Sequence, residues 1–451
     1  MEVPTENYEF RNIRDRTSVT SGVSDGEAEN ATHTTEIESR ALAPTDYGKQ
    51  AYLVLAGCTV IQAPVWGYST AFGVFQEYYQ THNTLKGSHA SVATVGTTLN
   101  GVIYLSMPIM FTALTRYPRL RPYCGPVGLF ITVASLILSS FATEVWQLIA
   151  SQGVLCAIGS GLLYAPTTLY LDEWFIARKG IAYGTIGAGK SAAGVVFPFL
   201  MSSLLEKYGP QTTLRVWAIS LCIMTSPLLV FLKPRIPVSR AVSQRPLSWS
   251  FLKHTTFWMM QVGNVVQAFG YLLPSTYLSS YAHTIGLPTI AGAILIAVLS
   301  MASGLGSLIH GYLNDRTTAA ITILVSSVGS TLAVFLLWGL RTEFGLLMAF
   351  AVVYGFFAGG FSSTYPGISK ALKNEDEGIE TGHVMGLLLG GRGLGFVIGG
   401  PISTALLRSS WSDTGYWGYT TVYGPVIVCT GATALLGAWR WMWDAGRRIR
   451  V

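Results

Sequence analysis

Long apolar runs alternate with short polar stretches from residue 51 to residue 440. The runs are about 20 residues long, which is the length that an α-helix needs to cross the hydrocarbon core of a bilayer. Each run therefore predicts a transmembrane helix, and we expect an all-α membrane protein with about 12 of them. The predicted spans are 51–75, 92–113, 122–142, 146–170, 180–204, 212–232, 255–281, 289–312, 318–339, 344–366, 381–406 and 418–440.

Three polar stretches lie before, between and after these two sets of spans. Residues 1–49 are rich in Ser, Thr and Glu and contain no apolar run, so we expect a disordered cytosolic tail there. Residues 233–254 are basic and predict a cytosolic linker, and residues 441–451 predict a basic cytosolic tail. The spans then divide into an N-terminal six-helix bundle over 50–232 and a C-terminal six-helix bundle over 255–440.

The two halves of the chain resemble each other. When the sequence is shifted by about 200 residues, unusual residues at the same place in each half fall together. Matches in the same order indicate a parallel repeat of two six-helix bundles, which is the plan of one large class of transporters. The matched pairs are Gly159 with Gly359, Pro166 with Pro366, Gly184 with Gly386, Lys190 with Arg392, and Gly67-Tyr68 with Gly270-Tyr271.

Composition and charge narrow the class of protein further. Only 12% of the residues are charged and 50% are hydrophobic, whereas a soluble domain carries roughly 25% charged residues. Lys and Arg gather in alternate loops, which predicts a multi-pass protein with both termini in the cytosol. We place it in the plasma membrane and read the net charge of +6 as membrane topology, not as nucleic-acid binding.

The chain shows no pattern that is typical of an enzyme. Its five cysteines follow no zinc or disulfide spacing, and no nucleophilic triad, carboxylate pair or metal cluster is visible. Residues 184–191 satisfy the phosphate-loop pattern, but that loop works between a strand and a helix in water, and this copy lies inside an apolar span. We therefore expect neither an enzyme nor a bound cofactor.

Small residues are concentrated in four predicted spans, 92–113, 180–204, 289–312 and 381–406, at equivalent places in the two halves. Small faces let helix backbones approach closely. They are interpreted either as general packing faces or as a sliding interface between the bundles.

Two cations lie near the middle of predicted spans, Lys190 in 180–204 and Arg392 in 381–406. A charge at the bilayer centre costs roughly 2.5–3.5 kcal/mol on insertion scales, so such a residue normally faces a cavity. No Asp or Glu lies deep in any predicted span, so neither cation has an acidic partner there. We therefore expect an anionic substrate to supply the negative charge. Arg can grip a carboxylate with two parallel hydrogen bonds, whereas Lys acts as a point charge. The alternative is that both contact helix carbonyls or a domain interface.

Other polar residues of the spans are candidates for the same site or for a gate. Six could line a pocket for an aromatic or polyketide-like acid, although a Tyr, Asn or Gln in a span can also bond a neighbouring helix. They are Tyr68, Asn100, Tyr164, Gln267, Tyr271 and Tyr365. Charged residues at span ends are expected to lock the bundles at the cytosolic side. They are Arg116, Asp315 and Arg316, with Asp172 and Glu173 as partners.

Several motifs resemble one family of membrane proteins. The chain is similar to the major facilitator superfamily over about residues 48–440, and within it to the fungal monocarboxylate-porter-like group. The residues that carry the resemblance are Phe72–Phe75, Gly159–Pro166, Trp174–Gly180, Val196–Pro198, Gly311–Arg316, Gly391–Gly395 and Gly400-Pro401. The resemblance implies two six-helix bundles that rock about a central site.

The combined expectation is a monomeric secondary active transporter of a small organic anion or carboxylated metabolite, working by alternating access. The resemblance allows efflux of a fungal secondary metabolite or uptake of a short monocarboxylate with a proton. Animal relatives use ionisable residues in helices 1 and 8, where this chain has Thr70, Ser303 and Ser307, which favours efflux. A non-transporting nutrient sensor with the same fold is the alternative from another class.

Overall fold

A computed structural model describes residues 43–82, 92–236, 249–340, 343–409 and 417–441, and these ranges contain helices and no strand. The predicted tails and linker fall largely outside them. Residues 1–42, 237–248 and 442–451 are not among the described residues.

The first half of the chain follows the predicted spans closely. The element η3 is π-helical and continues into α6, so that the span predicted over 146–170 is built from three joined segments. The helices are α2 (Lys49–His82), α3 (Val92–Arg116), α4 (Arg121–Ser139), α5 (Val145–Leu148), η3 (Ile149–Leu155), α6 (Cys156–Trp174) and α7 (Lys179–Leu229), with a short 3-10 turn η2 (Pro118–Leu120) before α4.

The helix α7 covers two predicted spans. Its 51 residues would extend far beyond a hydrocarbon core of about 30 Å at a rise of about 1.5 Å per residue. The helix breaks at Gly209, whose φ of 74° and ψ of 172° lie where glycine has no steric penalty, and Pro210 follows. The spans predicted over 180–204 and 212–232 therefore lie on either side of this break.

The second half shows two interruptions that hydropathy does not reveal. The span predicted over 255–281 divides at Leu272 into α8 and α9, and the one over 344–366 divides into α12 and the 3-10 turn η6 before α13. The elements are η4 (Ser250–Lys253), α8 (Thr255–Tyr271), α9 (Leu273–Thr284), α10 (Thr289–Arg316), α11 (Ala319–Leu332), η5 (Ala333–Trp338), α12 (Phe344–Gly359), η6 (Phe361–Thr364), α13 (Tyr365–Glu375), α14 (Thr381–Arg408), η7 (Gly418–Thr420) and α15 (Gly424–Leu436).

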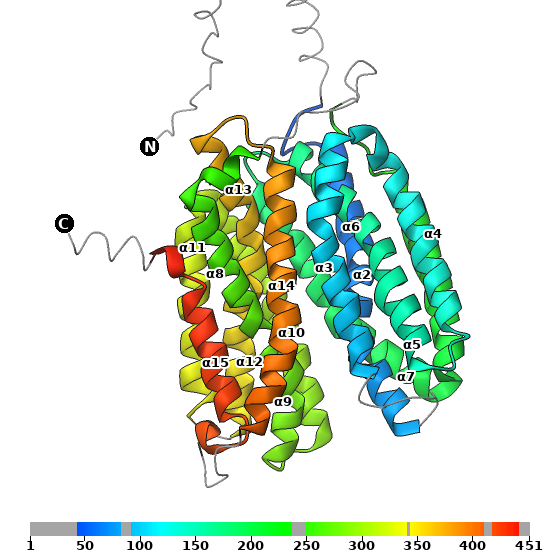
Figure 1. Ribbon diagram of the computed structural model, residues 1–451, viewed down its shortest axis with the longest axis vertical. Helices are drawn as coiled ribbons and strands as arrows, with labels where there is room; N and C mark the ends of the chain where they lie inside the picture. Colours follow the sequence, from blue (N-terminus) through cyan, green and yellow to red (C-terminus); the bar gives the residue numbers. More distant parts are fainter. Residues whose placement is uncertain (1–42, 83–91, 237–248, 341–342, 410–416, 442–451) are drawn as a thin grey trace, which may run out of the picture. The chain divides into compact units, whose positions relative to one another are not determined.

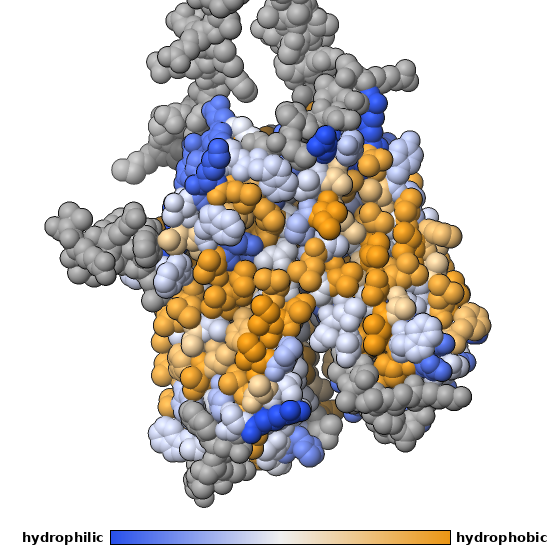
Figure 2. Space-filling view, viewed as in Figure 1, coloured by the Kyte–Doolittle hydropathy of each residue, from blue (hydrophilic) through white to orange (hydrophobic). Residues whose placement is uncertain are grey.

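Nine helices among the described residues are long and apolar enough to cross a membrane. Because α7 contains two spans, and because α8–α9 and α15 supply two more, the total is the twelve that the sequence predicts. On the face drawn in Figure 2, hydrophobic side chains gather over the middle of the helices and hydrophilic ones lie toward the helix ends. Large apolar side chains such as Ile109 and Phe130, each 74% exposed, are suited to contact with lipid.

The first six spans pack mainly among themselves, as do the last six, and two pairs of helices make the largest contacts between the halves. These pairs are α7 with α10 and α3 with α14, the latter lying side by side in Figure 1. Glycines make both contacts: a Cβ on Gly184 would overlap the backbone of Ser307, and a Cβ on Gly393 would overlap Tyr104. The four spans rich in small residues therefore form the largest contacts between the halves, and sliding at this interface stays a prediction.

Candidate functional site

Arg392 lies in the middle of α14 and is only 4% exposed. Its Nη1 donates a hydrogen bond to Oε1 of Gln267 in α8, at 3.1 Å, and to the hydroxyl of Tyr365 at the start of α13, at 3.4 Å. The guanidinium also lies 4.6 Å from the ring centre of Tyr271 and 5.2 Å from that of Phe396. The ion pairs found among the described residues lie elsewhere, at helix ends. Arg392 is thus held by neutral groups and ring faces.

Lys190 has a different environment in α7. Its ammonium lies 4.9 Å from the ring centre of Trp66 in α2 and 5.0 Å from that of Tyr164 in α6. Ring faces attract a cation but supply no opposite charge. Lys190 and Arg392 carry like charges, which repel each other. An anion placed between the bundles would remove this repulsion.

A continuous run of five aromatic rings joins the two cations, and we call it the aromatic belt: Tyr164, Trp66, Tyr104, Phe396 and Tyr271. Successive ring centres are 5.6, 4.9, 5.1 and 6.1 Å apart along it. The third step, from Tyr104 in α3 to Phe396 in α14, crosses from one half of the chain to the other. The belt therefore begins beside Lys190 and ends beside Arg392.

Two candidates from the sequence lie outside this cluster. The ring of Tyr68 packs on Phe75 and Trp217, and Asn100 accepts a 2.6 Å hydrogen bond from Ser69 through its Oδ1. Tyr68 follows Trp66 by two residues, which is about 200° around a helix, so only one of the two can face Lys190. The remaining candidates, Tyr164, Gln267, Tyr271 and Tyr365, are brought together with the two cations.

Three residues of the cluster around the two cations were not found from the sequence: Trp66, Tyr104 and Phe396. A usable signal existed for Phe396, which follows Arg392 by one helical turn and so shares its face. The sequence gives no such signal for Trp66 and Tyr104, because an aromatic residue in an apolar span cannot be distinguished from an ordinary core residue. Only the tertiary contact between α3 and α14 reveals the belt.

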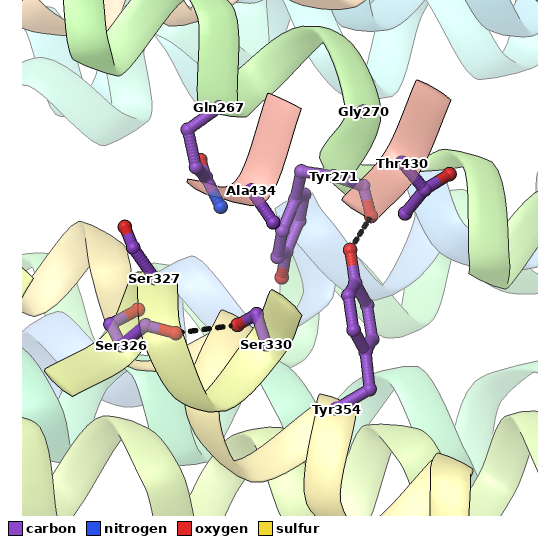
Figure 3. Close-up of a pocket in the computed structure, with 9 residues that line it drawn as sticks. All are labelled: Gln267, Gly270, Tyr271, Ser326, Ser327, Ser330, Tyr354, Thr430 and Ala434. Carbon is purple, nitrogen blue, oxygen red and sulfur yellow. Dashed lines mark hydrogen bonds between the residues drawn. The ribbon is translucent and has the colours of Figure 1, made fainter. Parts of the chain in front are cut away.

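A small polar pocket lies beside Arg392 within the C-terminal half (Figure 3). Its wall includes Gln267 and Tyr271, and the hydroxyl of Tyr354 donates a 3.2 Å hydrogen bond to the carbonyl oxygen of Tyr271. Ser326 and Ser330 on α11 donate to backbone carbonyl oxygens, while the buried Ser327 hydroxyl has no partner among the described residues. Two of the residues that contact the guanidinium, Gln267 and Tyr271, thus also line this pocket.

Two of the three carboxylates expected at a gate, Asp315 and Asp172, make contacts between the halves. Asp315, near the end of α10, accepts hydrogen bonds from the backbone N–H groups of Gly180 and Ile181 at 2.6 and 2.8 Å. These groups lie in the first turn of α7, where a negative charge is favourable. Asp172 in α6 accepts a hydrogen bond from Thr381 at the start of α14. Both contacts link the first six spans to the last six.

The ion-pair partners differ from the expected ones. Asp172 pairs with Lys179 at 2.6 Å, and Glu173 pairs with Arg121. Arg116 and Arg316 instead lie over the rings of their neighbours Tyr117 and Tyr312, at 5.6 and 5.4 Å. Among the described residues, Lys179 and Arg121 therefore occupy the two carboxylates that we expected to pair with these arginines, and a gating role for Arg116 and Arg316 stays a prediction.

Residues 54–368 match the family model described as Major Facilitator Superfamily. The chain belongs to this superfamily. Curated relatives include an MFS-type transporter, opdF, of Penicillium oxalicum, which is 29% identical over 86% of this chain and 90% of its own length. The aspyridones efflux protein apdF of Emericella nidulans is 25% identical over 87% of this chain and 78% of its own. The Fujikurins efflux protein of Gibberella fujikuroi is also 25% identical, over 90% and 86%.

Solved structures show the same fold. The human organic anion transporter MFSD10 aligns with a TM-score of 0.63 at 12% identity, over 87% of this chain and 100% of its own. The nucleoside transporter NupG aligns with a TM-score of 0.56 at 15% identity, over 88% and 98%. This major facilitator protein is a multi-pass membrane transporter of a small-molecule substrate. Its phosphate-loop pattern lies inside the helix α7, which confirms that residues 184–191 do not form a phosphate loop.

Proposed function

We propose that this major facilitator protein is a secondary active transporter of a small organic anion, with Arg392 and Lys190 at the substrate site. One observation carries the proposal: two cations from opposite halves are joined by aromatic rings, and no carboxylate pairs with either among the described residues. A bound anion would supply the missing charge, and Arg392 can offer a carboxylate two hydrogen bonds.

The direction that we propose is efflux of a secondary metabolite, through a monocarboxylate-porter-like member of the superfamily. Two fungal relatives are named as efflux proteins, one of aspyridones and one of fujikurins. The ionisable residues expected for proton-coupled uptake are replaced by Thr70, Ser303 and Ser307. We place the chain in the plasma membrane as a monomer with both termini in the cytosol. Protons remain a candidate co-substrate.

Alternating access would be rocking of one bundle, residues 50–232, against the other, residues 255–440. The contacts of Asp315 with the start of α7 and of Asp172 with Thr381 support a gate at the end that we assign to the cytosol. Both contacts would have to break when this end opens. The same end would include Arg116, Arg316 and Glu173, which make their contacts within one half.

Exchange in proteoliposomes tests the proposed function. Vesicles that contain the purified full chain and unlabelled 2-naphthoate are placed in labelled 2-naphthoate or in the labelled neutral amide, with protein-free vesicles as the control. We expect the acid to exchange and the amide not to, because only the acid neutralises Arg392 and Lys190. Equal exchange of the amide would overturn the anion site. No exchange of either compound would favour a sensor that does not transport.

A further inference from the structure

The aromatic belt is much larger than a short acid requires. Arg392 alone can hold a carboxylate with two hydrogen bonds. Each large aromatic side chain offers roughly 150–250 Å² of surface, so the five rings of the belt can cover a body of many carbon atoms. Tyr104, Tyr271 and Phe396 are only half-buried, so part of the surface of each residue is accessible.

The electrostatics of the rings determine where a charge can lie. The face of an aromatic ring is negative, so it attracts Lys190 and Arg392 and repels an anion. A bound anionic group must therefore contact one of the two cations at the ends of the belt. The part of the substrate that lies along Trp66, Tyr104 and Phe396 must be uncharged and able to stack on rings.

A further observation concerns the middle of the belt. The indole Nε1 of Trp66 is buried and has no hydrogen-bond partner among the described residues. A buried donor without an acceptor is costly and is usually satisfied by a ligand or by water. The ring of Trp66 lies between those of Tyr164 and Tyr104, so this unpaired donor belongs to the middle of the belt.

We propose that the substrate is an acid with a flat, conjugated body, and that Trp66, Tyr104 and Phe396 select it against saturated acids. This inference rests on the proposed anion site and adds the chemical class of the substrate. The anionic group binds Arg392 or Lys190, and the conjugated body stacks along the belt, where an oxygen of the substrate accepts from Trp66. Entry of the body separates Tyr104 from Phe396 and so acts on the contact between α3 and α14.

Matched pairs of acids test the inference by binding to the purified full chain in lipid nanodiscs. Benzoate is compared with cyclohexanecarboxylate, and 2-naphthoate with its fully saturated analogue, by isothermal titration. Charge and carbon number are equal within each pair. We expect the aromatic acid to bind more tightly, by on the order of tenfold for the larger pair. Phe396→Leu and Tyr104→Leu should each reduce this ratio, because the aromatic acid loses a stacking partner and the saturated acid does not.

Phe130→Leu is the control, because Phe130 is 74% exposed and lies outside the belt, and its ratio should equal that of the wild type. Equal affinities within each pair in the wild-type protein would overturn the inference, and so would an unchanged ratio in both belt variants. If Phe396→Leu fails to fold, the inference is still tested by Tyr104→Leu and by the affinities of the wild-type protein for the aromatic and saturated acids. Absence of binding by every acid would instead refute the anion site, and the inference would fall with it.

Discussion

Arg392 and Lys190 occupy equivalent places in the two halves but have different partners. Arg392 is oriented by hydrogen bonds from its guanidinium to Gln267 and Tyr365, whereas Lys190 lies over two ring faces. A planar guanidinium in a fixed orientation can present two donors to a carboxylate, and a lysine on a flexible stem contributes a charge. We therefore assign the geometry of anion binding to Arg392 and its long-range attraction to Lys190.

The first prediction concerns Gln267, which positions Arg392. Gln267→Leu removes the acceptor at 3.1 Å and lets the guanidinium turn away from the substrate. We expect anion affinity to fall by roughly 1 kcal/mol, the usual net value of one hydrogen bond. Gln261→Leu on the same helix is the control, because Gln261 donates to the backbone of Leu387 and does not contact Arg392. The affinity of each folded variant for 2-naphthoate is measured by titration. Equal affinities in the two variants would contradict a positioning role for Gln267.

The contact between α7 and α10 is tight at one end and loosens along the helices. A Cβ added to Gly180 or Gly184 would overlap backbone atoms of α10, whereas a Cβ on Gly194 would meet Thr70 of α2 at 3.7 Å and Ser300 of α10 only at 3.9 Å. The close end is also where Asp315 accepts hydrogen bonds from the start of α7. Glycines and a carboxylate thus hold the same end of this helix pair.

Substitution of these glycines should distinguish tight contact from loose contact. Gly184→Ala places a methyl group against the carbonyl oxygen of Ser307 and forces α7 away from α10. We expect the exchange of 2-naphthoate in proteoliposomes to fall several-fold, because the tight contact between α7 and α10 can no longer form. Gly194→Ala in the same helix has room for its methyl group and should exchange 2-naphthoate like the wild type. Similar rates in the two variants would show that the tight contact is not needed for transport.

The carboxylate of Asp315 should stabilise the closed end. Loss of a side chain that caps a helix N-terminus costs roughly 0.5–2 kcal/mol, so Asp315→Ala should increase the time that this end spends open. The reporter is maleimide labelling of Thr115→Cys, since Thr115 is buried against Gly382 of α14. We expect faster labelling with Asp315→Ala. Arg316→Gln is the control, because Arg316 lies over Tyr312 of its own helix, and faster labelling there too would contradict a specific role for Asp315.

At the scale of the whole molecule, the sequence predicts the spans well because hydropathy measures what the bilayer requires. Hydropathy does not predict the division at Leu272, since α8 and α9 together fill one predicted span. The two cations could be predicted because a charge in an apolar span is costly. The aromatic belt could not be predicted, because it depends on the ring contact between Tyr104 and Phe396. These two residues are far apart in the chain and share no sequence pattern.

The orientation of the molecule in the membrane is a further prediction. The Lys and Arg residues of alternate loops favour a cytosolic location for both termini. A tag added after Val451 should therefore resist protease applied to intact cells and become accessible after the membrane is permeabilised. Cleavage of the tag in intact cells, with a cytosolic marker still protected, would contradict the assigned orientation and place the Asp315 contact on the outer side.

Arg392 provides the most direct test of the central claim that an organic anion binds between the two halves. Anion affinity and folded amount are measured together for Arg392→Gln, Arg392→Lys and Arg215→Gln. Arg215 is the control, because it also lies over a ring, that of Phe141 at 4.7 Å, and donates to Ser140, but it lies outside the site.

We expect Arg392→Gln to lose roughly 1.5–3 kcal/mol of binding free energy for 2-naphthoate, the usual value of a charged hydrogen bond. Arg392→Lys should lose less, since it keeps the charge but not the two-pronged contact. Arg215→Gln should lower the folded amount without changing affinity. Wild-type affinity in well-folded Arg392→Gln would show that the anion binds elsewhere and would contradict the account.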